Sequence, residues 1–415
     1  MSRIAATATL LLSATAVAGP SNRGLIPFGE RAAMLGNAGI TSPAGEAVYY
    51  NPANLARIGH PNLSVSGSTY MLYQLSVDPI VVLQGEDQKF EASGFVAIPS
   101  TVISTYQIGR LSLASAVLVP EALTFKNRLT FETSMARVTI IQNRQESQLW
   151  LGGGAALELA DGVYAGVSVF AANTTESSYS YTRAQTGIDP VTQVTERTSS
   201  TDISVIGLTA IAGLQIQRGP LGIGARLHSP SIRLSGSGDN YSAASVVSQA
   251  MPAAQDTELE DVSVDRPLPI DAGVGVSYPA TPALRLLADV NLQLGARLTT
   301  VDDPRLPTAE SELNAAPRGA LGMELEVATK KWLRAGFVVN RSALAEPDNA
   351  DDAVREDYVG GTLGFAWQSG RTHTALGVFY LHGSIQTFVE GATPPREADA
   401  TGRLFGGLFT VSYRL

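Results

Sequence analysis

The main pattern in the chain is an alternation of apolar and polar residues with a period of two, which begins near Asn62 and continues to the last residue. Successive side chains of a β-strand point to opposite faces, so this pattern predicts strands with one apolar and one polar face. A soluble β-sandwich alternates too, with its apolar face turned inward. Here the segments exceed the usual strand length of about five or six residues and carry aromatic residues toward their ends, which favours a transmembrane β-barrel. The alternation is clearest in residues 270–278, 284–294, 318–327 and 404–415.

The segments predict an all-β fold, an antiparallel barrel of about fourteen strands. Tight turns such as Asp161-Gly162 alternate with long polar connections such as 236–264, and the connection 125–144 is expected to hold a short helix or a hairpin. Outer-membrane barrels have short periplasmic turns and long external loops, and an even strand number leaves both chain ends on the periplasmic side. The expected strands are 62–77, 90–108, 110–124, 145–160, 162–182, 198–217, 219–235, 265–279, 282–299, 313–328, 330–342, 355–370, 371–388 and 400–415.

Residues 29–59 do not alternate and are rich in alanine and glycine. Ser42-Pro43 can begin a helical turn, because serine caps a helix and proline suits its first position. The proline of Asn51-Pro52-Ala53 would bend or end that helix, and the residue before a proline is pushed away from the helical region. The stretch also contains apolar residues that need burial, which argues against the alternative of a loose linker. We therefore expect a compact hatch that plugs the barrel from inside.

The first residues have the features of a cleaved secretory signal. Arg3 precedes the apolar run 4–12, and Ala16-Val17-Ala18 matches the small-residue pattern of a signal-peptidase site. The run is too short to span a bilayer, which takes about 20 residues, so cleavage is expected rather than a retained anchor. The predicted organisation is a signal peptide, 1–18, a hatch, 19–60, and an outer-membrane β-barrel, 61–415.

Composition and charge narrow the function further. The 415-residue chain has no cysteine and a formal net charge of −9 at pH 7. A chain without cysteine can form no disulfide or thiolate metal site, although it is expected to be exported. A protein with a net negative charge is not suited to binding nucleic acid. The four histidines are scattered without the spacing of a metalloprotease or a catalytic triad, and no GxSxG motif is present. We expect no enzymatic activity, no cofactor, no metal and no nucleic-acid partner.

Four stretches in a fixed order add a more specific signal. Arg31-Ala32-Ala33 with the later Asn51-Pro52-Ala53 comes first, followed by Leu227-His228-Ser229-Pro230, by 268–292, and by Trp332-Leu333-Arg334-Ala335-Gly336-Phe337. In order and spacing, these stretches resemble the FadL/TodX-like outer-membrane transporters of long-chain fatty acids and aromatic hydrocarbons. The resemblance spans nearly the whole mature chain. It implies a fourteen-stranded barrel plugged by a small N-terminal hatch.

The resemblance also implies a function, the uptake of hydrophobic small molecules across the outer membrane of a Gram-negative bacterium. Movement of the hatch, with its motif of Asn51, Pro52 and Ala53, would release the ligand, and a kink in the third strand would let it leave sideways into the membrane. Pro120 lies in the expected third strand and cannot donate to a ladder, so it is the candidate for that kink. An ordinary proline at a strand end is the alternative.

Glu326 and six other charged residues are expected to face the lumen. Unpaired charges would be costly at that depth, so we expect a network that holds the hatch in place. An arginine among them could instead bind a substrate carboxylate. The six are Arg226, Arg285, Asp289, Arg318, Glu324 and Arg334.

The expected surroundings complete the prediction. Outer-membrane lipid and lipopolysaccharide would surround a monomeric barrel. The C-terminal residues 411–415 continue the last strand, with an aromatic residue near the end, and resemble the signal that barrel-assembly machinery reads. Two other functions stay open: a general porin, and a scaffold barrel of a secretion system, as in a related branch of FadL-like barrels.

Overall fold

The structure is a computed structural model of the whole chain. Its described residues are 22–66, 69–83, 86–98, 101–133, 136–187, 193–248, 253–305, 309–347, 354–389 and 396–415. The predicted signal peptide, 1–18, lies outside these residues. Three short helices come first: η1 (Ala32–Leu35), α2 (Ala47–Tyr50) and η2 (Pro52–Arg57).

Strands make up most of the remaining described residues. In chain order they are β1 (Asn62–Ser66), β2 (Thr69–Leu83), β3 (Glu86–Ile98), β4 (Thr101–Ile108), β5 (Leu111–Glu132), β6 (Ala136–Ala160), β7 (Val163–Thr186), β8 (Gln193–Arg218), β9 (Leu221–His228), β10 (Ile232–Ser248), β11 (Ala253–Ser263), β12 (Asp271–Pro279), β13 (Leu284–Gln293), β14 (Ala296–Val301), β15 (Ala309–Leu313), β16 (Ala316–Ala328), β17 (Lys331–Asn340), β18 (Arg355–Ser369), β19 (Thr372–Gln386) and β20 (Asp399–Arg414).

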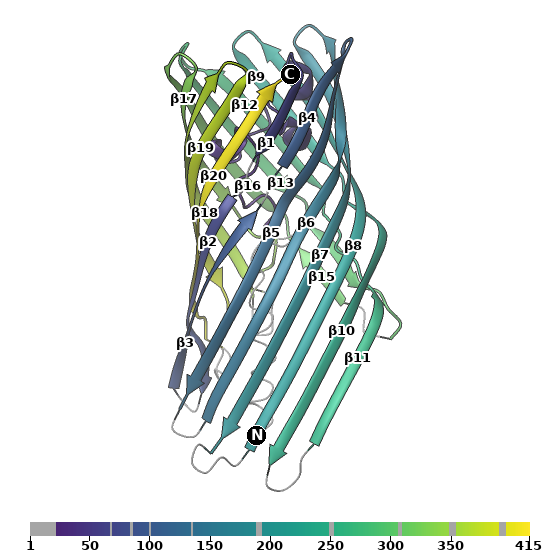
Figure 1. Cartoon of the computed structure of the whole chain (residues 1–415), viewed down its shortest axis with the longest axis vertical. Coiled ribbons are helices and arrows are strands. Elements are labelled where there is room, and N and C mark those ends of the chain that lie inside the picture. Colours follow the sequence, from purple (N-terminus) through teal and green to yellow (C-terminus); the bar gives the residue numbers. More distant parts are fainter. Residues whose placement is uncertain are drawn as a thin grey trace.

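These strands form fourteen antiparallel spans that close into a barrel, as the sequence predicted (Figure 1). Eight spans are single strands, and six consist of two consecutive strands with a short interruption, such as β1 with β2 and β3 with β4. Each span pairs with the one before and the one after it. The last strand, β20, pairs with both β1 and β2, so the barrel closes on its own first span and leaves no open edge there.

The alternating residues face the directions that a membrane barrel requires. Val274 and Leu321, on the apolar faces of their strands, are 59% and 56% exposed on the outer wall. Asp289, one position after an outward residue, is buried in the lumen. Apolar side chains therefore form the outer surface, where lipid replaces water, and polar side chains line the inside.

The short turns form where they were predicted. Gly109, Gly162, Gly219 and Gly370 all have positive φ, and Lys330 adopts the same left-handed conformation. A glycine has no Cβ and accepts this conformation without strain, which suits a tight turn between strands.

Four of the long connections differ from the prediction because most of their residues are strand: 78–89, 125–144, 183–197 and 236–264. The connection 125–144 is a hairpin with no helix among its described residues, since β5 continues to Glu132 and β6 starts at Ala136. The connection 236–264 is likewise largely the hairpin of β10 and β11. Figure 1 shows these hairpins extending from the barrel at the end opposite the C-terminus. In the projecting part of β5 the alternation is reversed, because the exposed residues, such as Lys126 and Arg128, are polar and the buried ones, such as Phe125 and Phe131, are apolar.

The hatch lies inside the barrel, at the end that carries the C-terminus (Figure 1). Its helical residues are almost entirely buried, including Met34 and Leu55. The helix expected to start at Ser42-Pro43 starts instead at Ala47, after turns whose backbone hydrogen bonds run from Ser42 to Gly39 and from Ala47 to Ala44.

None of the helices among the described residues has the length and apolar character needed to cross a membrane.

Candidate functional site

The Asn51-Pro52-Ala53 motif connects the hatch to the barrel wall. The Asn51 side-chain oxygen accepts the backbone N–H of Ala53 at 3.2 Å and caps helix η2, with Pro52 as its first residue. The Asn51 amide nitrogen donates to the carbonyl of Ile40 in the hatch at 2.9 Å and to that of Leu214 in β8 at 3.1 Å. Both polar atoms of this buried side chain are thus satisfied, and one of its hydrogen bonds reaches the wall.

Glycines that face the lumen make room for the hatch backbone. A methyl group on Gly213 would lie 2.0 Å from the Asn51 side-chain oxygen, and a methyl group on Gly336 would lie 2.0 Å from the backbone nitrogen of Gly36. Gly166 faces the backbone of Pro52 in the same way, at 2.5 Å. Contacts this short cannot form without displacement, so the hatch fits the wall only where these side chains are absent.

Asp289 of β13 binds the hatch through its backbone. Its carboxylate accepts the N–H groups of Gly39 and Ile40 at 2.7 and 2.9 Å. These two N–H groups would otherwise be buried without a partner, which is costly. A charged side chain of the wall therefore fixes the middle of the hatch.

Two buried carboxylates of the hatch, Glu30 and Glu46, complete its attachment. Glu46 accepts the backbone N–H groups of residues 30–32 at 3.0–3.3 Å, where helix η1 begins and N–H groups lack helical partners. Burial raises the pKa of Glu46 above its usual value, and the neighbouring Glu30 carboxyl adds to the shift. Glu30 accepts hydroxyl hydrogen bonds from Ser64 of β1 and Ser412 of β20 at 3.0 and 2.6 Å, so it lies where the barrel closes.

Arg31 forms an ion pair between the hatch and the wall. Two of its nitrogens bind the Glu324 carboxylate of β16 at 2.9 and 2.5 Å, a forked geometry that is characteristic of arginine. Arg334 of β17 binds the same carboxylate at 2.8 Å. One carboxylate thus binds two guanidinium groups.

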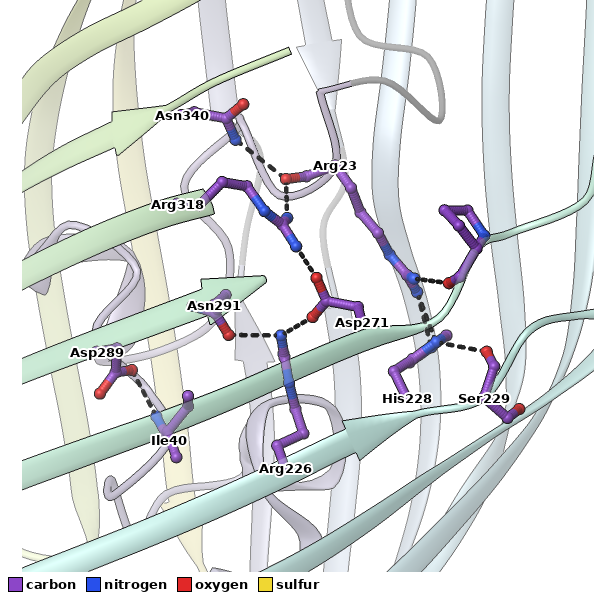
Figure 2. A network of polar contacts seen from close by, with 11 residues as sticks. Arg23, Ile40, Arg226, His228, Ser229, Asp271, Asp289, Asn291, Arg318 and Asn340 are labelled. Carbon is purple, nitrogen blue, oxygen red and sulfur yellow. Dashed lines mark hydrogen bonds and ion pairs between the residues drawn. The ribbon is translucent and has the colours of Figure 1, made fainter. Parts of the chain in front are cut away.

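A second ionic network lies deeper in the lumen (Figure 2). Asp271 of β12 pairs with Arg226 of β9, at 2.5 Å, and with Arg318 of β16. Arg226 also donates to the side-chain oxygen of Asn291 in β13 at 2.8 Å. The barrel register brings Asn291 directly opposite Arg318, so these groups meet because the ladders align them. Again two guanidinium groups share one buried carboxylate.

Arg23 adds a third guanidinium group (Figure 2). It lies in residues 22–28, the part of the hatch before its first helix, which we call the leading segment. Arg23 lies 2.7 Å from Nε2 of His228, and because a guanidinium can only donate, this ring nitrogen must be the acceptor. The guanidinium carbon lies 5.7 Å from the centre of the Trp150 ring, within the range of a cation–π contact. The Arg23 carbonyl accepts from Arg318 and, at 3.0 Å, from Asn340. The leading segment is therefore fixed to the wall on two sides.

These side chains line a cavity of about 50 Å³, which we call the cationic cavity. Its three guanidinium groups, from Arg23, Arg226 and Arg318, face the single carboxylate of Asp271, so positive charge is in excess. The rest of the lining is mainly aromatic and aliphatic and includes Phe28, Tyr49, Tyr50, Ala320 and Val338. Such a mixture suits a molecule with an apolar body and an anionic end.

An apolar cluster fills the lumen next to the cationic cavity. Tyr73 of β2 and Phe125 of β5 stack in it with their ring centres 5.8 Å apart. Leu25 and Ile26, which follow Arg23 in the leading segment, belong to this cluster. The leading segment thus has its charged residue in the cavity and its apolar residues in the cluster. Other members are Phe90, Phe131, Ile140, Phe379 and Leu404.

Pro120 interrupts the wall beside the cationic cavity, which it also lines. The ladder between β5 and β6 shifts between Leu118 and Glu121, and the ladder between β4 and β5 ends at Leu118. Past that point, β5 has no ladder with β3 among the described residues. Proline lacks the N–H that a ladder needs, which explains an interruption at this residue.

The six lumen charges named from the sequence lie in three places. Asp289 holds the hatch backbone, whereas Arg226 and Arg318 line the cationic cavity. The other three lie nearer the hatch end: Arg285, Glu324 and Arg334.

Several residues of these networks were not named from the sequence, among them Arg23, Glu30, Asp271 and Asn291. Asp271 and Asn291 occupy lumen-facing positions of alternating segments, so the same pattern could have identified them. Arg23 and Glu30 lie outside any periodic stretch, and no sequence signal distinguishes them.

The fold can be compared with solved structures. The toluene transporter TodX of Pseudomonas putida superposes with a TM-score of 0.61 at 12% identity, over 95% of this chain and all of that one. A FadL homologue of Pseudomonas aeruginosa gives 0.56 at 12% identity, over 95% and 98% of the two chains. The toluene transporter TbuX of Ralstonia pickettii gives 0.54 at 15% identity, over 94% and 99%. No protein-family model matches the sequence, and no curated protein matches it significantly.

A closed fourteen-stranded barrel with its N-terminal segment folded into the lumen is a plugged transmembrane β-barrel. Its fold is that of FadL and TodX, as the sequence resemblance indicated. At these identities the likeness is one of fold.

Proposed function

We propose that the protein takes up small hydrophobic molecules, long-chain fatty acids or aromatic hydrocarbons, across the outer membrane of a Gram-negative bacterium. The main support is the apolar cluster inside the barrel, where an aqueous pore would have polar walls. A molecule that avoids water gains about 0.8 kcal/mol for each methylene that it buries in such a place. The description of TodX and TbuX as toluene transporters agrees with this cargo.

The cationic cavity suggests how a carboxylated cargo would be held. Its apolar part would lie among residues such as Phe125 and Leu25, and its carboxylate would reach Arg226 and Arg318. A planar guanidinium group binds a carboxylate through two parallel hydrogen bonds, which gives direction as well as affinity. A neutral hydrocarbon would use the apolar cluster alone.

Release would follow a movement of the hatch and its leading segment. The cationic cavity, at about 50 Å³, is far smaller than ordinary ligand pockets of about 300–1,000 Å³, so a cargo needs the surrounding segments to move. The way toward the hatch end passes the charged groups of Arg31, Glu324 and Arg334, a poor route for an apolar molecule. The interrupted wall at Pro120 supports lateral exit into the membrane instead.

The proposal can be tested by uptake in cells. A deletion strain should accumulate labelled oleate and toluene more slowly than its parent, and a plasmid copy should restore both rates. Replacement of Arg226 and Arg318 by glutamine should lower oleate uptake more than toluene uptake, because only oleate carries a carboxylate. Parental uptake of both compounds by the deletion strain would reject the transport function.

Two alternatives have distinct signatures. A general porin would let sugars swell liposomes that contain the parental protein. A secretion scaffold would co-purify with protein partners, and its deletion would leave the uptake of hydrophobic nutrients unchanged. We further propose that the barrel is a monomer in outer-membrane lipid and lipopolysaccharide, inserted by barrel-assembly machinery.

A further inference from the structure

A separate pocket of about 320 Å³ opens between the hatch and the wall, near the short turns of the hatch end. We call it the mouth pocket. Its size falls within the usual range of small-molecule sites, about 300–1,000 Å³. It shares no lining residue with the cationic cavity. The lining residues that matter here are Arg31 of the hatch, Arg285 of β13, Glu324 of β16, and Trp332 and Arg334 of β17.

The pocket has more positive than negative charge at its centre. Arg285, Glu324 and Arg334 occupy one row across three adjacent strands, with Glu324 directly opposite both arginines. The Glu324 carboxylate nevertheless binds Arg31 and Arg334, and the Arg285 guanidinium makes no hydrogen bond or ion pair with a described residue. Glu326 of β16 also lines the pocket, so three guanidinium groups face two carboxylates and one positive charge is in excess.

A buried nitrogen of Arg334 gives an independent indication of a missing ligand. Arg334 is 3% exposed and lines the pocket, yet its Nη1 has no hydrogen-bond partner among the described residues. Its Nε and Nη2 are occupied by Glu324 and His373. A buried donor of a charged group without a partner is costly, and an anion in the pocket would satisfy it.

Most of the remaining lining is apolar or aromatic. Trp332 contributes a flat indole ring, packed against the His373 ring at 5.7 Å between centres. Near the turn between β12 and β13, the pocket is lined by Pro279, Pro282 and Leu284. A ligand that satisfies both halves has a carboxylate for the arginines and a flat apolar body for the tryptophan.

We propose that the mouth pocket binds a small organic anion, an aromatic monocarboxylate, at the hatch end of the barrel. Arg285 and the free nitrogen of Arg334 bind its carboxylate, and its ring stacks on Trp332. The pocket opens on the side of the hatch, which is the periplasmic side in the proposed orientation. The site stands on its own geometry and holds whether or not the barrel carries hydrocarbons.

The test uses purified full-length protein in detergent, with Trp332 as the only tryptophan after Trp150→Phe and Trp367→Phe. Benzoate should quench Trp332 fluorescence with saturation, whereas benzyl alcohol, its neutral analogue, should not. Arg285→Gln should weaken benzoate binding about tenfold or more, the effect expected for a lost charged hydrogen bond. The matched control is Arg218→Gln, which removes the same charge from an exposed turn outside the pocket and should leave binding unchanged.

Three results would overturn the proposal: equal quenching by benzyl alcohol, unchanged binding in Arg285→Gln, or equally tight binding of inorganic phosphate, which lacks an apolar body. If the single-tryptophan protein does not fold, Arg285→Gln and Arg218→Gln are compared by ¹⁹F NMR of 4-fluorobenzoate. Equal broadening of the fluorine resonance by the two variants would contradict the site. Trp332 lies outside the cationic cavity, so this experiment and the uptake assay can fail independently.

Discussion

At the scale of single residues, the lumen repeats one arrangement, in which a buried carboxylate is shared by two arginines. Asp271 forms ion pairs with Arg226 and Arg318, and Glu324 forms ion pairs with Arg31 and Arg334. Such pairs are worth little in water but matter when buried, because removal of one partner leaves a charge without compensation. The carboxylates are therefore the sensitive positions.

The first prediction concerns Asp271. Asp271→Asn should destabilise the folded barrel by about 3–5 kcal/mol, because it leaves two buried guanidinium groups without their shared counter-charge. Thermal unfolding of the detergent-solubilised protein, followed by its gel mobility, measures the loss. Asp256→Asn, on an exposed position of β11, removes the same charge and serves as the control. Equal unfolding temperatures for the two variants would show that the Asp271 network adds nothing to stability.

The second prediction concerns Gly336. Gly336→Ala would place its methyl group 2.0 Å from the Gly36 backbone nitrogen, so the hatch must shift at a cost of about 1–3 kcal/mol. Limited proteolysis should then cleave within residues 29–59 faster than in the parent. Gly407→Ala, where a methyl group meets nothing within 4 Å, should behave like the parent. The same protection in both variants would mean that the hatch does not depend on this close contact.

At the scale of elements, β5 differs from the other spans because its pairing on one side stops near Pro120. From Leu111 to Leu118, before Pro120, β5 pairs with β4 on one side and with β6 on the other. After Pro120, the described residues of β5 pair only with β6. A strand without a hydrogen-bonded ladder on one side leaves backbone groups available and can separate from the wall at lower cost. This is the physical basis for proposing exit at this point.

The third prediction follows from that interruption. Pro120→Ala restores an N–H group, so pairing can extend and the wall should open less readily. Uptake of labelled oleate and toluene should fall severalfold while the amount of folded barrel stays the same. Pro220→Ala, in the exposed turn between β8 and β9, is the control and should transport normally. Full uptake by Pro120→Ala would assign this proline no role in release.

At the scale of the whole molecule, the hatch and the barrel form one closed structure. The hatch contributes buried residues such as Met34 and Leu55, and the wall contributes glycines and carboxylates shaped to hold it. Neither part satisfies its polar groups alone. Without the hatch, Asp289 and Glu324 would lose partners, and the lumen would fill with water.

The fourth prediction tests this closure. Deletion of residues 29–59 should leave a barrel that folds with lower stability and forms an open aqueous channel. In planar bilayers its conductance should greatly exceed that of the parental protein, because the lumen is no longer filled. Liposome swelling with sugars gives the same comparison. A deletion variant that inserts but stays as closed as the parent would show that the hatch is not the plug.

The sequence by itself determined the strand architecture and the faces of the strands. Period-two alternation is a local property, so Val274 and Leu321 could be assigned to the outer face, and Gly162 to a turn, without knowledge of their neighbours. The same logic failed in the connection 125–144, where the alternation is reversed: apolar residues such as Phe125 and Phe131 are buried and the exposed face is polar.

Only the tertiary structure decided which lumen residues meet. Arg226 and Arg318 come together at Asp271 because the barrel closes with one register, and a shift of one residue would turn these side chains outward. Arg23 joins them only because the leading segment folds back into the lumen. These contacts join residues 45, 47 and 295 positions apart, and their geometry is set by the packing of the whole barrel, which no local pattern records.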